Sequence, residues 1–385
     1  MKKMFVEEEW IEVKEGIRSI CKEFPESYWQ KLDQQRTYPQ EFVNTLTDSG
    51  FLAALIPKKY GGSGLSLRAA SLILEEIHRS GGNGAACHAQ MYIMGSLLRH
   101  GDDKLKNRYL PEIATGNLRL QAFGVTEPTS GSDTLSIKTS AKKNGNKYII
   151  NGQKVWTSRA EYSDLILLLA RTNNFEIKKN NLSLFLIDMR SHVGKSIFIK
   201  PIKTMINHSS TEIFIDNLEV DDDCLVGEEG RGFQYILDGM NAERILIASE
   251  CIGDAKYFID KAKTYANQRI VFGRPISKNQ SIQFPIARAY ANTRAAELMV
   301  QKACLLYDEN YKCGEESNLA KLLAAEASWE AAEMAMQTFG GYSFAEEYNI
   351  ERKFREARLY QIAPVSTNMI LAYLSHKVLG MPRSY

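Results

Sequence analysis

The segment FGVTEPTSGSD, from Phe123 to Asp133, lies where the hydrophobic pattern of the chain changes. Before it, up to residue 120, apolar residues recur three and four positions apart with glycines at the ends of the repeats, as in amphipathic helices. After it, over 121–230, short runs of β-branched and aromatic residues alternate with turns rich in Asn, Gly, Ser and Lys, which is typical of strands. The predicted strand runs are KYIINGQKVWTS, DLILLLARTN, LSLFLIDM, SIFIKPI and STEIFIDNLEV. Long helical patterns return over 231–385. We therefore predict an α+β protein with a helical domain at 1–120, a β-domain at 121–230 and a helical domain at 231–385.

Composition excludes several classes of protein. A chain of 385 residues with 44% hydrophobic and 24% charged residues is typical of a globular protein of two or three packed units. A formal net charge of +2 favours neither nucleic acid nor an anionic membrane as a partner. The N-terminal residues lack a signal-peptide pattern and no run approaches 18 apolar residues, so we expect no membrane span. The six cysteines form no CxxC pair and the six histidines lack ligand spacing, which predicts a reduced, cytoplasmic protein without a metal site.

The segment FGVTEPTSGSD is itself rich in hydroxyl groups and glycine. Thr126 and Ser132, with the backbone N–H groups around Gly131, could bind a phosphate or the polar edge of a ring. The segment is neither a Walker A loop nor a GxGxxG turn, so a classical mononucleotide or Rossmann site is not supported. Taken alone, its composition favours a polar β-turn.

Three further segments allow both structural and cofactor-binding interpretations. Trp156 stands beside hydroxyl residues at a strand end, where it could stack on a flat cofactor ring, although its position alone favours a half-buried strand tryptophan. Arg269 lies near the end of a predicted helix, where it could offset the helix dipole or bind a pyrophosphate. In the pair Gly340–Gly341 one glycine would end a helix, and the second indicates that another group approaches the backbone closely.

A glutamate interrupts the apolar stripe of the segment LDGMNAERILIASECIG, Leu237–Gly253. On a helix with about 100° per residue, Glu243 falls within roughly 60° of three apolar side chains, Ile236, Met240 and Ile247. Burying an unpaired carboxylate there would cost several kcal/mol. From the residues alone, an ion pair that joins helices is the ordinary interpretation, and a catalytic group is the alternative.

Five motifs occur in the order and spacing of one protein family. They are VTEPTSGSD, INGQKVWTS, ERILIASECIG, NQRIVFGRPI and QTFGGYSFAEEYNIERKFREAR. Over nearly its whole length the chain therefore resembles the acyl-CoA dehydrogenase family of flavoproteins. The resemblance implies an acyl-CoA dehydrogenase fold, with an N-terminal all-helical domain, a middle β-domain and a C-terminal four-helix bundle. It also implies FAD as cofactor, an acyl-CoA substrate, and a homo-oligomer, with a tetramer as the expected form, in which FAD crosses a subunit interface.

The resemblance assigns cofactor contacts to matching positions. Thr126 and Ser132 would hydrogen-bond the flavin and its pyrophosphate. Trp156 would cover one face of the isoalloxazine ring, and Ser158 would reach its N5 edge. Contacts to the FAD of a neighbouring subunit would come from Arg269, Phe272 and Gln280, and contacts to its adenine end from Gln337, Gly340 and Gly341. The remaining implied cofactor-binding residues are Phe123, Val125, Gly131, Ser366 and Asn368.

The position of the catalytic base separates branches of this family. Its commonest members carry a glutamate in a YEGT motif, where this chain reads QIAPVSTN and has Pro364. A branch that includes isovaleryl- and long-chain acyl-CoA dehydrogenases carries the base just before an arginine, on the first long helix of the C-terminal bundle. By this resemblance Glu243, followed by Arg244, would take the α-proton while flavin N5 takes the β-hydride. Ser132, Met240 and Arg244 would bind the substrate, and electrons would pass to an electron-transfer flavoprotein, as in fatty acid β-oxidation.

Two other classes of flavoprotein share this fold. A flavin-dependent monooxygenase or oxidase would also lack the C-terminal glutamate, but it has no evident use for Glu243. A nucleic-acid-associated flavoprotein of the alkylation-response branch would need an additional basic domain, for which 385 residues of nearly neutral net charge leave no room. The sequence leaves open the length and branching of the acyl chain, and whether CoA or an acyl carrier protein carries it.

Overall fold

The computed structural model of the chain describes residues 10–172 and 181–383. Contacts between Cα atoms divide these residues into two compact units. The helical unit comprises the residues up to Gln35, Ser66–Gly84 and the residues from Asn241 onward, and the sheet unit comprises Arg36–Leu65 and Ala85–Met240. Along the chain, helices precede and follow the strands, as the hydrophobic pattern predicts.

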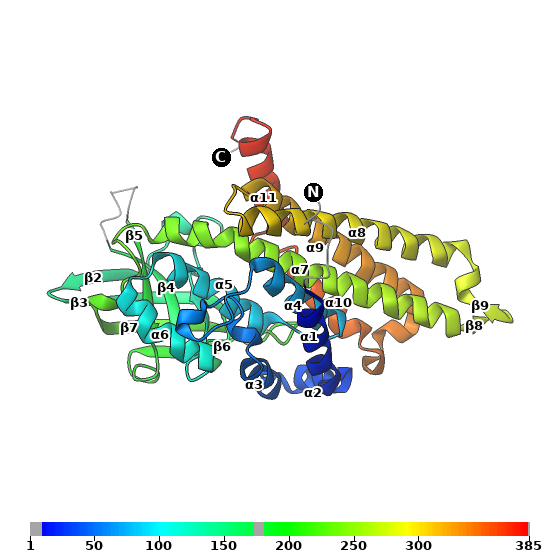
Figure 1. Cartoon of the computed structure of the whole chain (residues 1–385), viewed down its shortest axis with the longest axis horizontal. Helices are drawn as coiled ribbons and strands as arrows, with labels where there is room; N and C mark the ends of the chain where they lie inside the picture. Colours follow the sequence, from blue (N-terminus) through cyan, green and yellow to red (C-terminus); the bar gives the residue numbers. More distant parts are fainter. Residues whose placement is uncertain (1–9, 173–180, 384–385) are drawn as a thin grey trace. The chain divides into compact units, whose positions relative to one another are not determined.

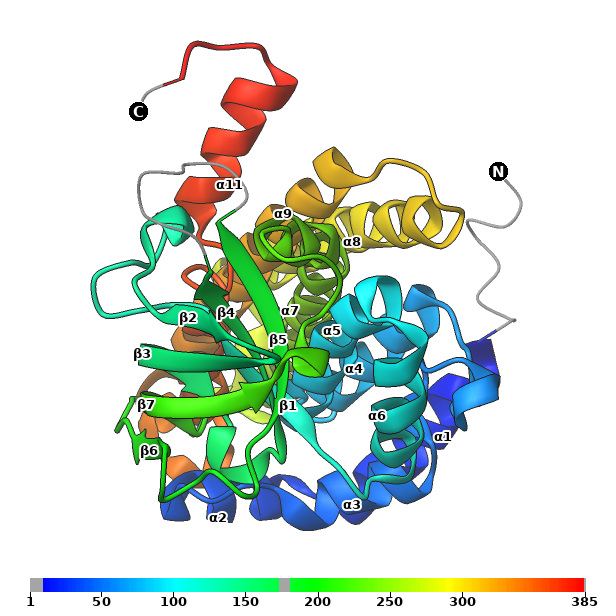
Figure 2. The same cartoon turned by 90° about the vertical axis from the view of Figure 1, so that its left-hand side faces the viewer.

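The sheet unit contains a seven-stranded sheet (Figure 2). Its strands are β1 (Leu120–Gly124), β2 (Ser140–Asn144), β3 (Lys147–Ser158), β4 (Leu165–Arg171), β5 (Leu182–Asp188), β6 (Ile197–Pro201) and β7 (Ser210–Asp221). They follow the order β1-β4-β2-β3-β7-β6 with β5 paired to β4, and β1 runs parallel to β4 while β3, β7 and β6 are antiparallel. The same unit holds the helices α3 (Gln40–Asp48), α5 (Ala85–His100) and α6 (Asp103–Thr115).

Strand β4 reads LILLLAR and is buried along its whole length. Leu165, Leu167 and Leu169 belong to a core that also contains side chains of α5 and α6. The residues between them belong to a second core, formed with side chains of β3, β5 and β7. Because successive side chains of a strand point to opposite faces, a continuous apolar run is what a strand covered on both faces requires.

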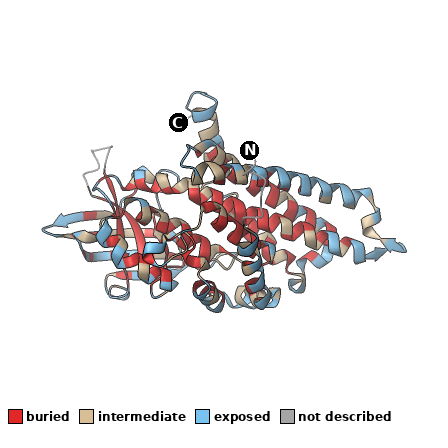
Figure 3. Ribbon diagram, viewed as in Figure 1, coloured by how far each residue is buried: buried red, intermediate tan, exposed pale blue. Residues whose placement is uncertain are grey.

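The helical unit consists mainly of helices. They are α1 (Ile11–Glu23), α2 (Glu26–Gln35), α4 (Leu67–Arg79), most of α7 (Gly232–Gln268), α8 (Gln280–Asp308), α9 (Gly314–Phe339), α10 (Ile350–Leu359) and α11 (Thr367–Tyr373). The longest of them are α7, α8 and α9. Helices α7, α8 and α9 lie side by side (Figure 1), and their facing sides are buried (Figure 3). The buried core between them is rich in alanine. Gly253 of α7 packs so close to α4 that a Cβ there would lie 2.3 Å from the carbonyl oxygen of Glu75. Small residues therefore set the distances between these helices.

A network of buried charges joins α4, α7 and α10. His78 Nδ1 lies 2.9 Å from Asp254 Oδ1, and Lys353 Nζ lies 2.5 Å from the same oxygen. The Glu356 carboxylate contacts Lys353 at 3.0 Å and Arg352 at 2.9 Å. Burial by itself raises the pKa of Glu356, but Lys353 and Arg352 lower it to about 2. Removing one member would leave an uncompensated buried charge, which costs about 3–5 kcal/mol.

The compact units do not follow the predicted division of the chain at 120 and 230. Helices α1, α2 and α4 group with the C-terminal helices, whereas α3, α5 and α6 group with the sheet. The three-domain division therefore stays a prediction about sequence segments. Two strands, β1 and β2, were not among the runs that predicted the sheet. Over residues 10–172 and 181–383, every helix is too short or too polar to cross a bilayer.

Candidate active site

Trp156 occupies an irregularity of β3 that turns its side chain toward solvent. The register between β3 and β7 shifts between Lys154 and Thr157, which is a β-bulge. Trp156 has a φ of 60°, in the left-handed region, and 59% of the residue is exposed. This corrects the expectation of a half-buried strand tryptophan. A bulky residue with positive φ costs on the order of 1–3 kcal/mol and persists only where its surroundings impose it, most often at functional sites.

A buried ion pair holds this bulge against the segment FGVTEPTSGSD. Lys154 is fully buried, and its ammonium donates to Val125 O at 3.0 Å and to Glu127 Oε1 at 2.9 Å. Burial lowers the pKa of Lys154 to about 8, although Glu127 raises it. The Glu127 carboxylate also accepts hydrogen bonds from the N–H groups of Lys138 at 2.6 Å and Thr139 at 2.9 Å. This ion pair was not predicted from the sequence. Each of its members lies in one of the family motifs, Glu127 in VTEPTSGSD and Lys154 in INGQKVWTS.

The predicted flavin-contacting hydroxyls lie on the two segments that this ion pair joins. The N–H of Val155 donates to the carbonyl oxygen of Thr126 at 2.9 Å, so Thr126 is brought beside Trp156. Thr126 is half-buried and Ser132 is exposed, and a Cβ on Gly131 would meet no atom within 4 Å. The other predicted cofactor residues of the sheet unit are half-buried: Phe123, Val125 and Ser158. The exposed indole of Trp156 therefore lies beside the hydroxyl-rich segment that contains Thr126.

A second set of predicted residues gathers around the hairpin of β8 (Ile270–Val271) and β9 (Arg274–Pro275). Phe272 and Gly273 form its two-residue turn with φ of 51° and 76°, and Phe272 is fully exposed. The Arg269 guanidinium lies 5.5 Å from the ring centroid of Tyr342, which brings the turn after α9 beside the hairpin. The other members of this set are exposed: Gln280, Gln337, Gly340 and Gly341. A Cβ on either glycine of the pair would meet no atom of the described chain within 4 Å, so the chain itself does not supply the predicted close approach.

Glu243 lies on α7 and is only 2% exposed, which confirms the burial predicted from the apolar stripe. Ile236 and Ile247 on the same stripe are also buried, and Met240 is half-buried. Burial lowers the pKa of the neighbouring Arg244, whereas the charge of Glu243 raises it. The two side chains therefore act on each other electrostatically, with Glu243 buried and Arg244 half-buried.

The turn between α10 and α11 contains Pro364 at the position of the YEGT glutamate. Its conformation is fixed from inside the helical unit by Lys321 of α9, which is fully buried. The Lys321 ammonium donates to the carbonyl oxygens of Tyr360 and, at 2.7 Å, of Val365. Ser366 caps α11 by accepting a hydrogen bond from a backbone N–H of that helix at 3.3 Å. Asn368, the other predicted residue of this segment, is exposed.

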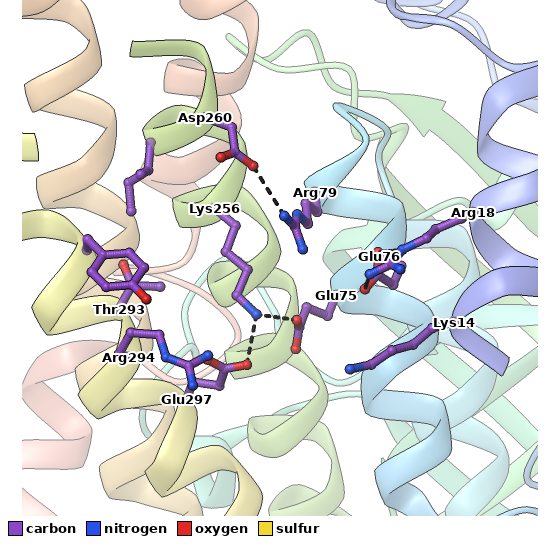
Figure 4. A pocket seen from close by; sticks show the side chains of 12 residues that line it. Lys14, Arg18, Glu75, Glu76, Arg79, Lys256, Asp260, Thr293, Arg294 and Glu297 are labelled. Carbon is purple, nitrogen blue, oxygen red and sulfur yellow. Dashed lines mark hydrogen bonds and ion pairs between the residues drawn. The ribbon is translucent and has the colours of Figure 1, made fainter. Parts of the chain in front are cut away.

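A cavity of about 260 Å³ in the helical unit is lined by charged side chains of α1, α4, α7 and α8 (Figure 4). Charged side chains of this cavity form ion pairs with one another. Lys256 lies 2.6 Å from Glu75 and 2.8 Å from Glu297, and Arg18 lies 2.7 Å from Glu76. The residues predicted for catalysis and cofactor binding are not among its lining residues. In the described part of the chain, no group of His, Cys, Asp and Glu side chains could hold a metal ion.

Comparisons with known proteins agree on one family. Models of the N-terminal, middle and C-terminal domains of acyl-CoA dehydrogenases match residues 7–117, 122–218 and 230–375. An acyl-CoA dehydrogenase of Mycobacterium bovis is 31% identical over 385 residues, covering 99% of each chain. The structure of glutaryl-coenzyme A dehydrogenase with glutaryl-CoA matches with a TM-score of 0.92 and 28% identity, covering 98% of this chain and 97% of that one. A structure described as an electron transferring flavoprotein of Acidaminococcus fermentans matches with a TM-score of 0.92 and 27% identity, covering 97% and 98%.

These matches confirm the predicted family and fold class, with a helical N-terminal domain, a middle β-domain and a helical C-terminal domain. The chain belongs to the acyl-CoA dehydrogenase family, FAD-dependent oxidoreductases that dehydrogenate acyl-CoA thioesters.

Proposed function

We propose that this chain removes hydrogen from the α and β carbons of an acyl-CoA thioester, giving the 2-enoyl product, with Glu243 as the base. The main support is the burial of the Glu243 carboxylate on α7, next to Arg244, in a chain that has Pro364 at the alternative base position. Removing an α-proton needs a proton acceptor held in place in a dry site. Glu243 takes that proton onto a carboxylate oxygen, and Arg244 with Met240 and Ser132 holds the substrate.

The residues of the sheet unit fit FAD, which when bound supplies the acceptor for the β-hydride. The exposed indole of Trp156 offers a face for a planar ring, and the hydroxyls of Thr126 and Ser158 offer hydrogen bonds to its polar edge. Ser132 and the open backbone at Gly131 suit the pyrophosphate. The same proposal includes the other predicted contacts: Phe123, Val125, Arg269, Phe272, Gln280, Gln337, Gly340, Gly341, Ser366 and Asn368.

Assembly and electron transfer complete the proposal. The fully exposed Phe272 at the tip of a hairpin, beside the exposed Arg269, supports a homo-oligomer in which this tip reaches the FAD of a second copy, with a tetramer as the expected form. The proposed electron acceptor is an electron-transfer flavoprotein, as the resemblance to the family implies. We further propose a cytoplasmic enzyme of fatty acid β-oxidation.

The test is anaerobic stopped-flow reduction of the bound flavin by a panel of acyl-CoAs, with wild type and Glu243→Gln compared at equal FAD occupancy. Glutamine keeps the size and hydrogen bonding of the side chain but accepts no proton. We expect reduction to slow by about 10²–10⁴-fold with substrate binding retained. Glu250→Gln is the matched control, because Glu250 is a second buried carboxylate of α7, seven residues further along, that lies 3.6 Å from His78.

Equal reduction rates for wild type and Glu243→Gln would identify Glu243 as a structural ion pair. A slow Glu250→Gln variant would show that loss of any buried α7 carboxylate disturbs the site. Rapid reoxidation by dioxygen, at a rate matching turnover with an electron-transfer flavoprotein, would identify an oxidase or monooxygenase instead.

A further inference from the structure

Four aromatic rings pack together where α9 ends. Tyr265 of α7 stacks on Phe339 of α9, with ring centroids 4.1 Å apart and an interplanar angle of 16°. Tyr348 meets both rings edge-on, at 5.7 Å from Phe339 and 6.3 Å from Tyr265. Tyr342, in the turn after α9, lies 5.4 Å from Tyr348 and 6.5 Å from Tyr265. Aromatic pairs at these distances attract one another, so the other three rings hold the ring of Tyr342 in place.

Tyr342 in turn contacts the side chain of Arg269. The Arg269 guanidinium lies 5.5 Å from the Tyr342 ring centroid, which is within the range of a cation–π contact. The backbone of Arg269 is fixed as well, because its N–H donates to the carbonyl oxygen of Tyr265 at 2.9 Å and its own carbonyl oxygen accepts from the N–H of Ile276 at 2.9 Å. Contacts within the helical unit therefore restrain both the backbone and the guanidinium of this arginine.

No carboxylate of the described chain lies within ion-pair distance of the Arg269 guanidinium. Other arginines of the helical unit have such a partner: Arg355 lies 2.6 Å from Asp33, and Arg352 lies 2.9 Å from Glu356. An aromatic ring attracts a cation but does not neutralise it. The positive charge of Arg269 is therefore left for an anion that comes from outside the chain.

The surroundings of Arg269 suit a ligand that brings such an anion. The hairpin of β8 and β9 projects beyond the ends of α7 and α8 (Figure 1), and Phe272 at its tip is fully exposed. Tyr342 is 45% exposed and directly follows the open backbone of Gly340–Gly341. The hydroxyl of Ser343, which is buried, fixes this turn by donating to the carbonyl oxygen of Gly340 at 2.7 Å. A restrained arginine thus lies beside a restrained turn, and both are accessible.

We propose that Tyr342 is a positioning residue for the cofactor: it holds the Arg269 guanidinium in the conformation that receives the pyrophosphate of FAD bound to a second copy of the chain. This inference rests on the proposed function, in which Arg269 contacts that FAD. An unrestrained arginine loses rotamer freedom when it binds an anion, and this loss corresponds to about two- to tenfold in affinity. Because Tyr342 restrains Arg269 before FAD binds, the folded protein has already lost that freedom.

A double-mutant cycle at the two positions tests this role. The measurement is equilibrium FAD binding by holoprotein dialysed against graded concentrations of FAD, read from flavin absorbance and compared at equal oligomeric state by light scattering. We expect Tyr342→Leu, which removes the ring, to bind FAD about two- to tenfold more weakly, and Tyr342→Phe, which keeps it, to bind as wild type. Arg269→Gln should bind about tenfold or more weakly, because a charge-assisted hydrogen bond is lost. In the Arg269→Gln background, Tyr342→Leu should cause no further loss, since it acts only through Arg269.

Trp329→Leu is the matched control, because it removes the ring of another arginine–aromatic pair of the helical unit, in which Arg358 lies 5.2 Å from the ring centroid. This variant should bind FAD as wild type, and weak binding would overturn the inference by showing that the loss of any such ring disturbs the cofactor. If Tyr342→Leu fails to fold, Tyr342→Met, which fills more of the space of the ring, replaces it in the same cycle.

Two other results would overturn this inference and leave the proposed function standing. One is wild-type FAD affinity in Tyr342→Leu while Arg269→Gln binds weakly. The other is an additive loss in the double variant, because Tyr342 would then act independently of Arg269. Wild-type FAD affinity in Arg269→Gln would overturn both the inference and the proposed contact of Arg269 with FAD.

Discussion

Replacing Trp156 with glycine separates the cofactor-binding role of the indole from the stability of the sheet. With 59% of the residue exposed, about 100 Å² of a side chain that can bury up to about 250 Å² is covered. At about 25 cal/mol per Å², that surface contributes at most about 2.5 kcal/mol. Glycine would relieve the strain of the left-handed backbone, which stabilises the folded state by about 1–3 kcal/mol. It would also raise the conformational entropy of the unfolded chain, which destabilises the folded state by about 0.5–1 kcal/mol. The free energy of unfolding of the FAD-free protein should therefore fall by only about 1 kcal/mol.

Urea unfolding of the FAD-free protein measures this loss, and titration with FAD measures binding. We expect Trp156→Gly to bind FAD at least about tenfold more weakly, because stacking on the ring is lost. Trp29→Ala is the control, since Trp29 is 5% exposed on α2 and its loss should cost about 3–5 kcal/mol without changing FAD affinity per folded protein. If Trp156→Gly instead lost about 3 kcal/mol or more and bound FAD normally, the indole would be a structural residue and the reasoning from its exposure would be wrong.

The buried network and the hairpin tip give two further predictions. The pKa of Glu356 is lowered to about 2 in the folded protein, so the stability from its charge is fully present above the ordinary value of 4.5 and is lost as the pH falls from there through about 2. Urea midpoints should fall more steeply over this range for wild type than for Glu356→Gln, and parallel curves would contradict the role of the charge. Phe272→Asp should leave each chain folded, because the side chain is fully exposed, but should produce a smaller species in light scattering with weaker FAD binding. Unchanged assembly and FAD affinity in that variant would exclude the hairpin tip from the interface.

The sequence predicted most of the strands because their patterns are strong, and it missed those that depend on their neighbours. The run KYIINGQKVWTS coincides with β3, and the run of apolar residues in LILLLAR coincides with β4. Strand β2 reads SAKKN, which is mostly polar, and it is a strand because it pairs with β3. Strand β1 reads LQAFG and is buried under α5, so its few residues show no alternation. Pairing across the sheet is not encoded in either short segment alone.

For the candidate site, the sequence predicted the burial of Glu243 but not the exposure of Trp156. The burial of Glu243 followed from helical periodicity, since a charged residue on an apolar stripe is visible in the pattern. The same reasoning does not find Lys321 of α9, because two of its neighbours three and four residues away, Ser317 and Asn318, are polar residues that are nevertheless buried. The exposure of Trp156 could not be predicted from its place in the strand pattern, because it depends on a bulge held by Lys154 and by Glu127 from another segment. The hydrophobic periodicity of a segment gives no information on its contacts with segments that are distant in the sequence.

The buried network also has a consequence for how the chain is made. His78 pairs with Asp254, 176 residues further along, and approaches Lys353, 275 residues further along. Synthesis starts at the N-terminus, so α4 leaves the ribosome long before the helices that neutralise and cover it. The segments of the sheet unit, in contrast, are all complete by Met240. Contacts of long sequence separation form late, and segments that wait for them expose apolar surface. The nascent chain is therefore most vulnerable to aggregation, and most in need of a chaperone, while α1, α2 and α4 await the residues from Asn241 onward.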